Sequence, residues 1–186
     1  MQAIDLLLTR RSARTLSEPG PDGAALELIL ASAARAPDHG RLRPWRFVVI
    51  RGAARERFGA LLAAQLQRVR PDSSAETLQR ESHKALRAPL IVVVAGRCNE
   101  AAKIPAVEQL LSAGAAAHAM MLCAVALGFN AMWKTGGAAY DAEVKSGLGL
   151  SPSDAIVGFL YFGSEHGERP PLPPDEWQRL VSELSP

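Results

Sequence analysis

This sequence of 186 residues has few of the groups that carry metal or nucleophile chemistry. Its two cysteines, Cys98 and Cys123, form no CxxC pair, which argues against a disulfide framework and a zinc knuckle. The four histidines lack the spacing of metal ligands. The sequence contains no GxGxxG, GxxxxGK(S/T) or GxSxG motif. We therefore expect no metal site, Rossmann dinucleotide site, P-loop or serine-hydrolase elbow.

A targeting segment is also not expected. The apolar run AIDLLL at residues 3–8 comes before the pair Arg10 and Arg11, whereas a twin-arginine export signal carries its apolar segment after the pair. Unpaired cysteines suit a reducing compartment. These features together predict a cytoplasmic protein.

Length and composition are typical of an ordinary globular protein. With 48% hydrophobic and 22% charged residues, the chain can bury a core and lacks the composition of a disordered protein. We expect one domain over residues 1–186, in which residues from about 164 to 186 form an extended proline-rich tail.

Charge is distributed unevenly along the chain. Ten of the 17 arginines lie in residues 1–57 with six acidic residues, so this third carries +4 and the remainder −2. A basic end could bind nucleic acid. However, its aromatics are only Trp45 and Phe47, and no nucleic-acid-binding motif accompanies the arginines. Nucleic-acid binding is therefore the weaker interpretation.

Hydrophobic periodicity and turn residues predict an α+β fold. Helices are expected over residues 3–10, 21–37, 53–69, 73–86, 105–129 and 142–150, and strands over 45–52, 88–97, 130–136 and 154–163. In the fourth helix, Ser73 and Glu76 fit a capping box best. The mixture of elements and the short linkers predict a sheet of about four strands wrapped by helices.

The long helix between residues 105 and 129 has no charged residue from 110 to 127. A helix that is apolar on every face must be buried on every face, so His118 is expected to be a buried histidine. A membrane span is the competing interpretation, but the run is rich in alanine and barely long enough. Since a chain of this size can hardly cover such a helix, we expect a homodimer with Met120 in the contact.

An arginine-rich segment, TRRSAR at residues 9–14, follows the first predicted helix. Arg10, Arg11 and Ser12 supply charged forks and a hydroxyl suited to an anionic group such as a phosphate. A plainer interpretation is a helix C-terminus whose cations complement the helix dipole. Spacing alone favours the plainer interpretation.

A second segment, RAPDHGRLRPW at residues 35–45, is a loop dense in polar groups. Such loops often bind ligands, and a solvated surface loop is the alternative. Asp38 and His39 are adjacent and cannot easily form a relay with each other, so His39 is a weak candidate for a general base. The roles of Arg41 and Arg43 stay open.

A third segment, MWKTGG at residues 132–137, ends a predicted strand with Lys134, Thr135 and two glycines. Its backbone could approach a flat ligand closely, or the segment could be a simple strand-to-turn exit. Arginines suited to anions, without obvious catalytic side chains, indicate a protein that takes its chemistry from a cofactor.

These segments, in this order, resemble the nitroreductase family of flavin-dependent oxidoreductases. RRSAR resembles the family's N-terminal Arg-Arg-Ser motif, and APDHGRLRPWRFVVI resembles its Ala-Pro, six residues, Pro-Trp, strand pattern. LGFNAMWKTGG and IVGFLYFG resemble its second half. The resemblance covers nearly the whole chain and is greatest to short bacterial members named as NAD(P)H nitroreductases. It implies a nitroreductase-like α/β sandwich, with a central, mostly antiparallel sheet flanked by helices, in an intertwined homodimer with FMN at two interface sites.

The resemblance also implies which residues bind the cofactors. FMN would contact Arg10, Arg11, Ser12, Trp133, Lys134 and Thr135, and Arg35 and His39 would reach the same flavin from the partner subunit. Contact with NAD(P)H is implied for Cys123, Ala124, Val125, Ala126, Leu127 and Gly128. Arg169 is a further candidate ligand of the phosphate. Hydride would pass from NAD(P)H through flavin N5 to a small acceptor, so no side chain is expected as an essential acid or base.

The chain departs from the wider family in the second segment. Asp38, Arg41 and Arg43 stand where members often carry serine, asparagine and glutamine. Arginine only donates hydrogen bonds, so a more cationic pocket above the flavin is expected. The sequence does not identify the acceptor or the preference between NADH and NADPH. Reductive dehalogenation, dehydrogenation and a non-enzymatic FMN carrier or sensor are alternatives on the same fold.

Overall fold

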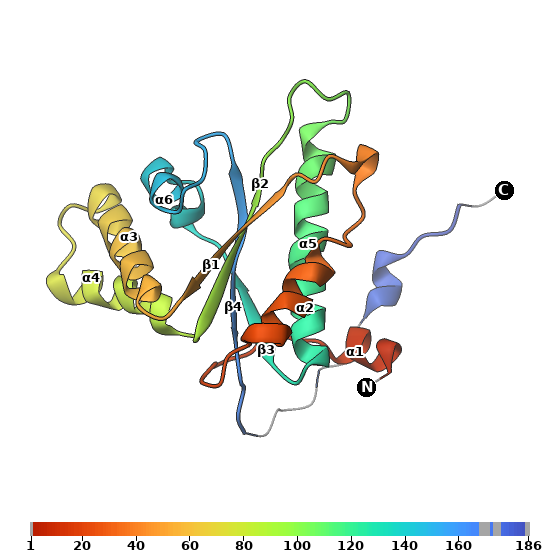
Figure 1. Ribbon diagram of the computed structural model, residues 1–186, viewed down its shortest axis with the longest axis horizontal. Coiled ribbons are helices and arrows are strands. Elements are labelled where there is room, and N and C mark those ends of the chain that lie inside the picture. Colours follow the sequence, from red (N-terminus) through yellow and green to blue (C-terminus); the bar gives the residue numbers. More distant parts are fainter. Residues whose placement is uncertain (1, 168–171, 173–175, 185–186) are drawn as a thin grey trace.

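A computed structural model describes residues 2–167, 172 and 176–184 of the chain. At its centre lies a sheet that has four strands in this part of the chain (Figure 1), β1 (Trp45–Arg51), β2 (Leu90–Gly96), β3 (Asn130–Lys134) and β4 (Ala155–Gly163). The strand order is β1-β2-β4-β3, and each neighbouring pair is antiparallel. The predicted α+β fold with an antiparallel sheet flanked by helices is confirmed.

Helices cover both faces of this sheet (Figure 1). One side carries α1 (Ala3–Thr9), α2 (Gly23–Ala33) and α5 (Ala106–Ala126), and the other carries α3 (Ala54–Val69), α4 (Ala75–Ser82) and α6 (Ala142–Gly147). Short 3-10 helices lie at His39–Arg41, His83–Leu86, Gly137–Ala139 and Trp177–Leu180. Because β2 is covered on both faces, all seven of its residues are buried, which explains its continuous apolar sequence LIVVVAG.

The side chains of β2 alternate between two apolar clusters. Ile91 and Val93 pack with Phe58 of α3 on one face of the sheet. Val92 packs with Met120 of α5 on the other face. This alternation follows from the two-residue period of a strand. Neighbouring side chains of a strand therefore belong to different clusters, one on each face of the sheet. The same holds for the side chains at the end of β3.

Within the chain, α5 is buried on one side only. Its buried residues are Gln109, Ser112, Ala113, Ala116, Ala117, Met120, Met121 and Ala124. The opposite side leaves His118 exposed and Leu111 67% exposed, so the chain by itself does not bury His118. Met120 is fully buried in the chain's own core, so its predicted place in a dimer contact is wrong as well. Although α5 is long and apolar enough to span a membrane, its packing on the sheet and α2 makes it a core helix.

The cap of α4 differs by one residue from the expectation. Ser74, and not Ser73, is the N-cap, because its hydroxyl accepts a hydrogen bond from the Thr77 N–H at 3.2 Å. Ser73 donates its own N–H to Arg70 O at 3.1 Å, which keeps it in the preceding turn. The short-range sequence pattern therefore located this helix start to within one residue.

Candidate functional site

The arginine-rich segment runs from the end of α1 to the edge of the sheet. Arg10 caps α1 by donating its N–H to Leu6 O at 3.1 Å. Beyond it, the Ala13 N–H donates to Ala131 O of β3 at 3.0 Å, and Ala13 is buried. Arg10 and Arg11 are half-buried and Ser12 is exposed. The backbone bond places this segment beside β3, the strand that carries the third sequence motif.

One carboxylate joins this segment to two other parts of the chain. Glu165, just after β4, accepts the Arg14 N–H on Oε1 at 3.0 Å. Its Oε2 accepts a hydrogen bond from Asn130 Nδ2 at 2.6 Å. No local sequence pattern marks Glu165, because its partners lie far away along the chain. Its bonds hold the N-terminal segment against the start of β3.

A pocket of about 390 Å³ opens where the N-terminal segment meets β3. We call it the Lys134 pocket. It is lined by Arg14, Thr15, Leu16, Leu86, Arg87, Met132 and Lys134. The side chains of Arg14, Arg87 and Lys134 form no ion pair with any residue that the structure describes. Three uncompensated cations beside apolar side chains suit a ligand that is both flat and anionic.

Of these cations, only Lys134 was expected at the cofactor. Arg14 lies within the TRRSAR segment but was not assigned a role. Arg87 lies in an inconspicuous stretch, KALRAP, and no local signal marks it. It reaches the pocket because the Leu86–Arg87 turn precedes β2 and faces the same side of the sheet as Met132.

Tyr161 lies opposite Met132 in the β3–β4 ladder. Burial raises the pKa of Tyr161 to about 12, although the nearby Arg87 acts to lower it. The phenol therefore stays protonated at neutral pH and can donate a hydrogen bond but cannot act as a base.

The three predicted cofactor residues of the third motif do not point the same way. Lys134 shares a face of the sheet with Met132, whereas Trp133 packs in the cluster on the α5 side. The Trp133 indole Nε1–H donates to Val157 O at 3.2 Å, which fixes the ring against β4. Thr135 is exposed just beyond the strand. The Lys134 side chain alone among the three lines the pocket with Arg14.

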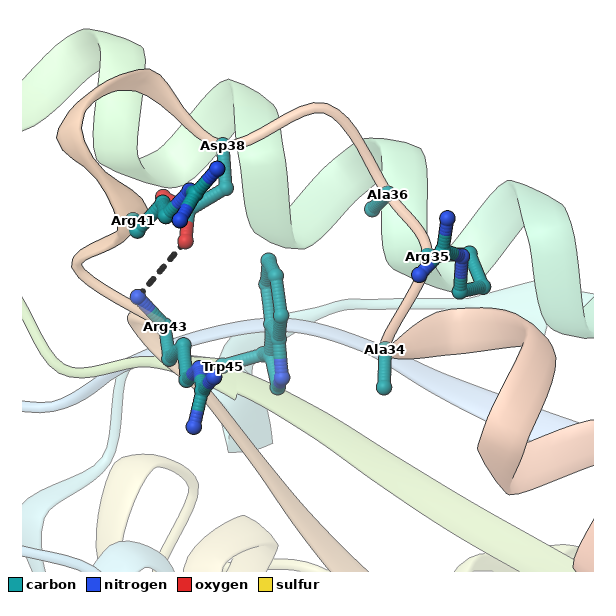
Figure 2. Close-up of a pocket in the computed structure, with 7 residues that line it drawn as sticks. All are labelled: Ala34, Arg35, Ala36, Asp38, Arg41, Arg43 and Trp45. Atoms are coloured by element: carbon teal, nitrogen blue, oxygen red, sulfur yellow. Dashed lines mark hydrogen bonds between the residues drawn. The ribbon is translucent and has the colours of Figure 1, made fainter.

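A second pocket, of about 400 Å³, is formed by the loop between α2 and β1 (Figure 2). We call it the Trp45 pocket. It is lined by Ala34, Arg35, Ala36, Asp38, Arg41, Arg43 and Trp45. Asp38 organises the loop, since its Oδ2 accepts the Arg43 N–H at 2.7 Å and its backbone O accepts the Arg41 N–H at 3.2 Å. Arg41 and Arg43 both have left-handed backbones, with φ of 55° and 48°.

His39 forms its side-chain contact with a helix residue and not with Asp38. Its Nδ1 lies 2.6 Å from Oε2 of Glu108 on α5. The pair borders a third pocket of about 370 Å³, lined also by Leu111 and Ser112. Glu108 was not predicted, and its contact orients the imidazole so that Nε2 is left for another partner.

The stretch implied for NAD(P)H contact forms the C-terminal end of α5. Ala124 is fully buried, whereas Leu127 and Gly128 are exposed at the turn. Cys123, Val125 and Ala126 add no charged group. A helix C-terminus carries partial negative charge, which disfavours phosphate. Contact with the nicotinamide therefore stays a prediction, with Ala126, Leu127 and Gly128 as its exposed members.

The predicted FMN residues thus fall into two groups. Lys134, with the adjoining segment of Arg10, Arg11 and Ser12, lies at the edge near β3. Arg35 and His39 lie on the α2–β1 loop, and the Trp45 pocket shares no lining residue with the Lys134 pocket. Arg169 lies outside the described residues.

Comparison with known proteins agrees with this architecture. Residues 7–164 match the model of a family described as the nitroreductase family. The chain is 42% identical over 164 residues to the protein named "Putative NAD(P)H nitroreductase YdjA" of Escherichia coli (strain K12), covering 88% of each chain.

Solved structures share the fold at lower identity. A nitroreductase-like family protein from Bacillus cereus superposes with a TM-score of 0.84 at 22% identity, covering 99% of this chain and 96% of that one. The FMN and NADPH-dependent nitroreductase NfnB from sphigopyxis sp. strain HMH superposes with a TM-score of 0.78 at 21% identity, covering 100% of both chains.

Proposed function

Because the chain belongs to the nitroreductase family, we propose that it is an FMN-dependent oxidoreductase that passes hydride from NAD(P)H to a small acceptor. The name of the Escherichia coli relative supports NAD(P)H as donor, and that of NfnB supports FMN as cofactor. When bound, FMN would supply the hydride chemistry at its N5. The protein would supply binding, orientation and charge.

The observation that carries this proposal is the charge of the Lys134 pocket. Arg14, Arg87 and Lys134 converge there without an acidic partner in the described chain, beside the apolar Leu16 and Met132. Such a lining suits FMN, which combines a flat ring with a phosphate. We assign the phosphate and ribityl chain to the neighbouring segment of Arg10, Arg11 and Ser12, and the ring to the region of Lys134 and Thr135. Trp133 would support this region through its packing on β4.

A second copy of the chain would complete the site. Large apolar side chains are exposed on the side of the sheet that carries α1, α2 and α5 (Figure 1). They are Ile4, Leu7, Leu8, Leu28, Val107, Leu111 and Leu127. A two-fold partner would bury this surface and bring its Arg35 and His39 to the flavin held at the Lys134 pocket. We therefore propose a homodimer with two shared sites.

No protein group is required as an essential acid or base in this function. Tyr161 is protonated at neutral pH, since burial raises its pKa to about 12. Cations at the Lys134 pocket would stabilise negative charge that develops on a reduced ring. Catalysis would then depend on orientation and electrostatics, which is the usual division of work in a cofactor enzyme.

Absorbance of the purified protein tests the proposal. We expect a flavin spectrum, either as isolated or after incubation with FMN, and bleaching by NADH or NADPH without oxygen. A protein that stays colourless when offered FMN would reject the function and leave nucleic-acid binding to be considered. A yellow protein that neither nucleotide bleaches would be a passive flavin carrier.

A further inference from the structure

We propose that the Trp45 pocket binds an oxyanion, a carboxylate or a phosphate, carried by a molecule that exchanges hydride with the flavin and that has a planar ring. The inference rests on the proposed function, because the resemblance to nitroreductases places Arg35 and His39 against the partner's flavin. Arg35 lines the Trp45 pocket, and Asp38 is shared with the adjoining pocket of His39. A molecule in the Trp45 pocket would therefore lie beside the reactive ring.

The charge of the pocket is the first argument. Arg35, Arg41 and Arg43 line it, and none of their guanidinium groups forms an ion pair with a residue in the described part of the chain. Asp38 is the one acidic residue in the lining, and its carboxylate already accepts the backbone N–H of Arg43 at 2.7 Å. The lining therefore keeps an excess of positive charge, which an anionic ligand would neutralise.

The backbone of the loop is the second argument. Arg41 and Arg43 occupy left-handed conformations that glycine or asparagine adopts at lower cost. Asp38 accepts a hydrogen bond from the N–H of each of them. The loop thus holds two arginines in a conformation that ordinary side chains avoid, and such strain is common where a side chain serves a ligand.

Trp45 gives the pocket a flat apolar surface. In Figure 2 the indole stands between Arg35 on one side and Arg41 and Arg43 on the other. A planar molecule could stack on the indole while its carboxylate or phosphate meets a guanidinium fork. Asparagine or glutamine at positions 41 and 43 could not supply this charge. The pocket would therefore select anionic over neutral partners of the same shape.

Calorimetric binding to the oxidised full-length protein tests this proposal without turnover. Two pairs of probes differ only in one anionic group: 4-nitrobenzoate against 4-nitrobenzamide for the carboxylate of an acceptor, and 2′,5′-ADP against 5′-AMP for the phosphate of NADPH. We expect the anionic member of one pair to bind about tenfold more tightly or better. The pair that shows the preference identifies the source of the anion.

Variants locate the preference in the pocket. Arg41→Asn and Arg43→Asn remove charge but suit the left-handed backbone, so the loop is expected to fold. The double variant should lose the preference for the anion, while Arg51→Gln, at the other end of β1, should keep it. Equal binding within both pairs, or a preference unchanged in the double variant, would overturn the proposal.

The flavin assay separates this inference from the proposed function. A yellow protein that NADPH bleaches but that binds both members of each pair equally would keep the function and reject the anion site. A colourless protein that still prefers an anion through Arg41 and Arg43 would reject the assignment of the site to hydride exchange.

Discussion

Arg97 and Asp154 form a two-pronged ion pair, with Arg97 Nε and Nη2 at 2.8 and 2.7 Å from the two carboxylate oxygens. Asp154 is fully buried, and its Oδ2 also accepts the Ser151 N–H at 2.9 Å. The backbone N–H of Arg97 in turn donates to Pro44 O at 2.7 Å. These bonds fasten the end of β2 and the start of β4 to the base of the loop that forms the Trp45 pocket.

Replacing Asp154 should weaken the fold and loosen this loop. Asp154→Asn removes the charge that Arg97 binds and turns an amide N–H toward a guanidinium that can only donate. We expect the free energy of unfolding to fall by about 2 kcal/mol, as measured by urea denaturation at pH 7. Glu143→Gln, which breaks the exposed ion pair with Arg68, should change it by less than about 0.5 kcal/mol. Equal effects of the two substitutions would contradict a special role for Asp154.

The contribution of Asp154 should depend on pH. Hydrogen bonds from Arg97 lower the pKa of Asp154 below its ordinary value of 3.8 and outweigh the burial that raises it. A lowered folded-state pKa means that the stabilisation is complete above the unfolded pKa and is lost as the pH falls through the folded one. The difference between wild type and Asp154→Asn should therefore be constant from pH 7 to 5 and shrink below pH 4. A difference that persists undiminished in acid would show that the ion pair is not its source.

The local sequence pattern was sufficient to predict most helices and strands. It failed where contacts with residues distant in the sequence determine the structure. The strand expected over residues 88–97 is observed at Leu90–Gly96, because a short continuous run of apolar residues is typical of a strand that is buried on both faces. The helix expected over residues 21–37 ends at Ala33, since the Arg35 N–H bonds to Ser32 O in a turn before Pro37. The exposure of His118 in its own chain could not be predicted, because an uncharged helix gives no sign of which side the chain leaves uncovered.

The candidate site was predictable only in part. The motifs pointed to Lys134 and to the arginine-rich segment, but Arg87 and Glu165 reach this region through the β-sheet and carry no local signal. Glu108 approaches His39 from a different helix for the same reason. The alternation of β3, which turns Trp133 and Lys134 to opposite faces, follows from the strand period and could have been predicted.

Gly158 should be intolerant of a side chain because of Trp133. A Cβ at this position of β4 would meet Nε1 and Cδ1 of the indole. Gly158→Ala should therefore displace the ring from Val157 O and destabilise the protein by about 1–3 kcal/mol in thermal or urea unfolding. In the background of Trp133→Ala the same substitution should cost much less, because the obstructing ring is gone. Additive effects of the two substitutions would refute the contact.

FMN binding should depend on cations at the N-terminal segment and at β3. Arg11→Ala removes charge-assisted bonds to the proposed phosphate and should weaken FMN by about 2 kcal/mol, or roughly 30-fold. Lys134→Ala should weaken FMN in the same direction, whereas Arg70→Ala, exposed at the end of α3, should leave affinity unchanged. Titration of the apoprotein by flavin fluorescence measures all three. Undiminished flavin content of the Arg11 variant after dialysis would remove Arg11 from the site.

The proposed dimer is tested best on the uncovered side of α5. Met120 is unsuitable, because it is fully buried in its own chain and a charge there would unfold the protomer. Leu111→Lys instead changes a side chain that is 67% exposed, so the protomer should fold while the second copy meets an unpaired charge. We expect dissociation to become easier by about 100-fold or more, with a 19.9 kDa species in sedimentation and loss of bound FMN. Val69→Lys, on the opposite side of the sheet and 59% exposed, adds the same charge and should stay dimeric and yellow. If the Leu111 variant behaves like the Val69 variant, the partner binds another surface. The shared FMN site then does not depend on a dimer contact at α5.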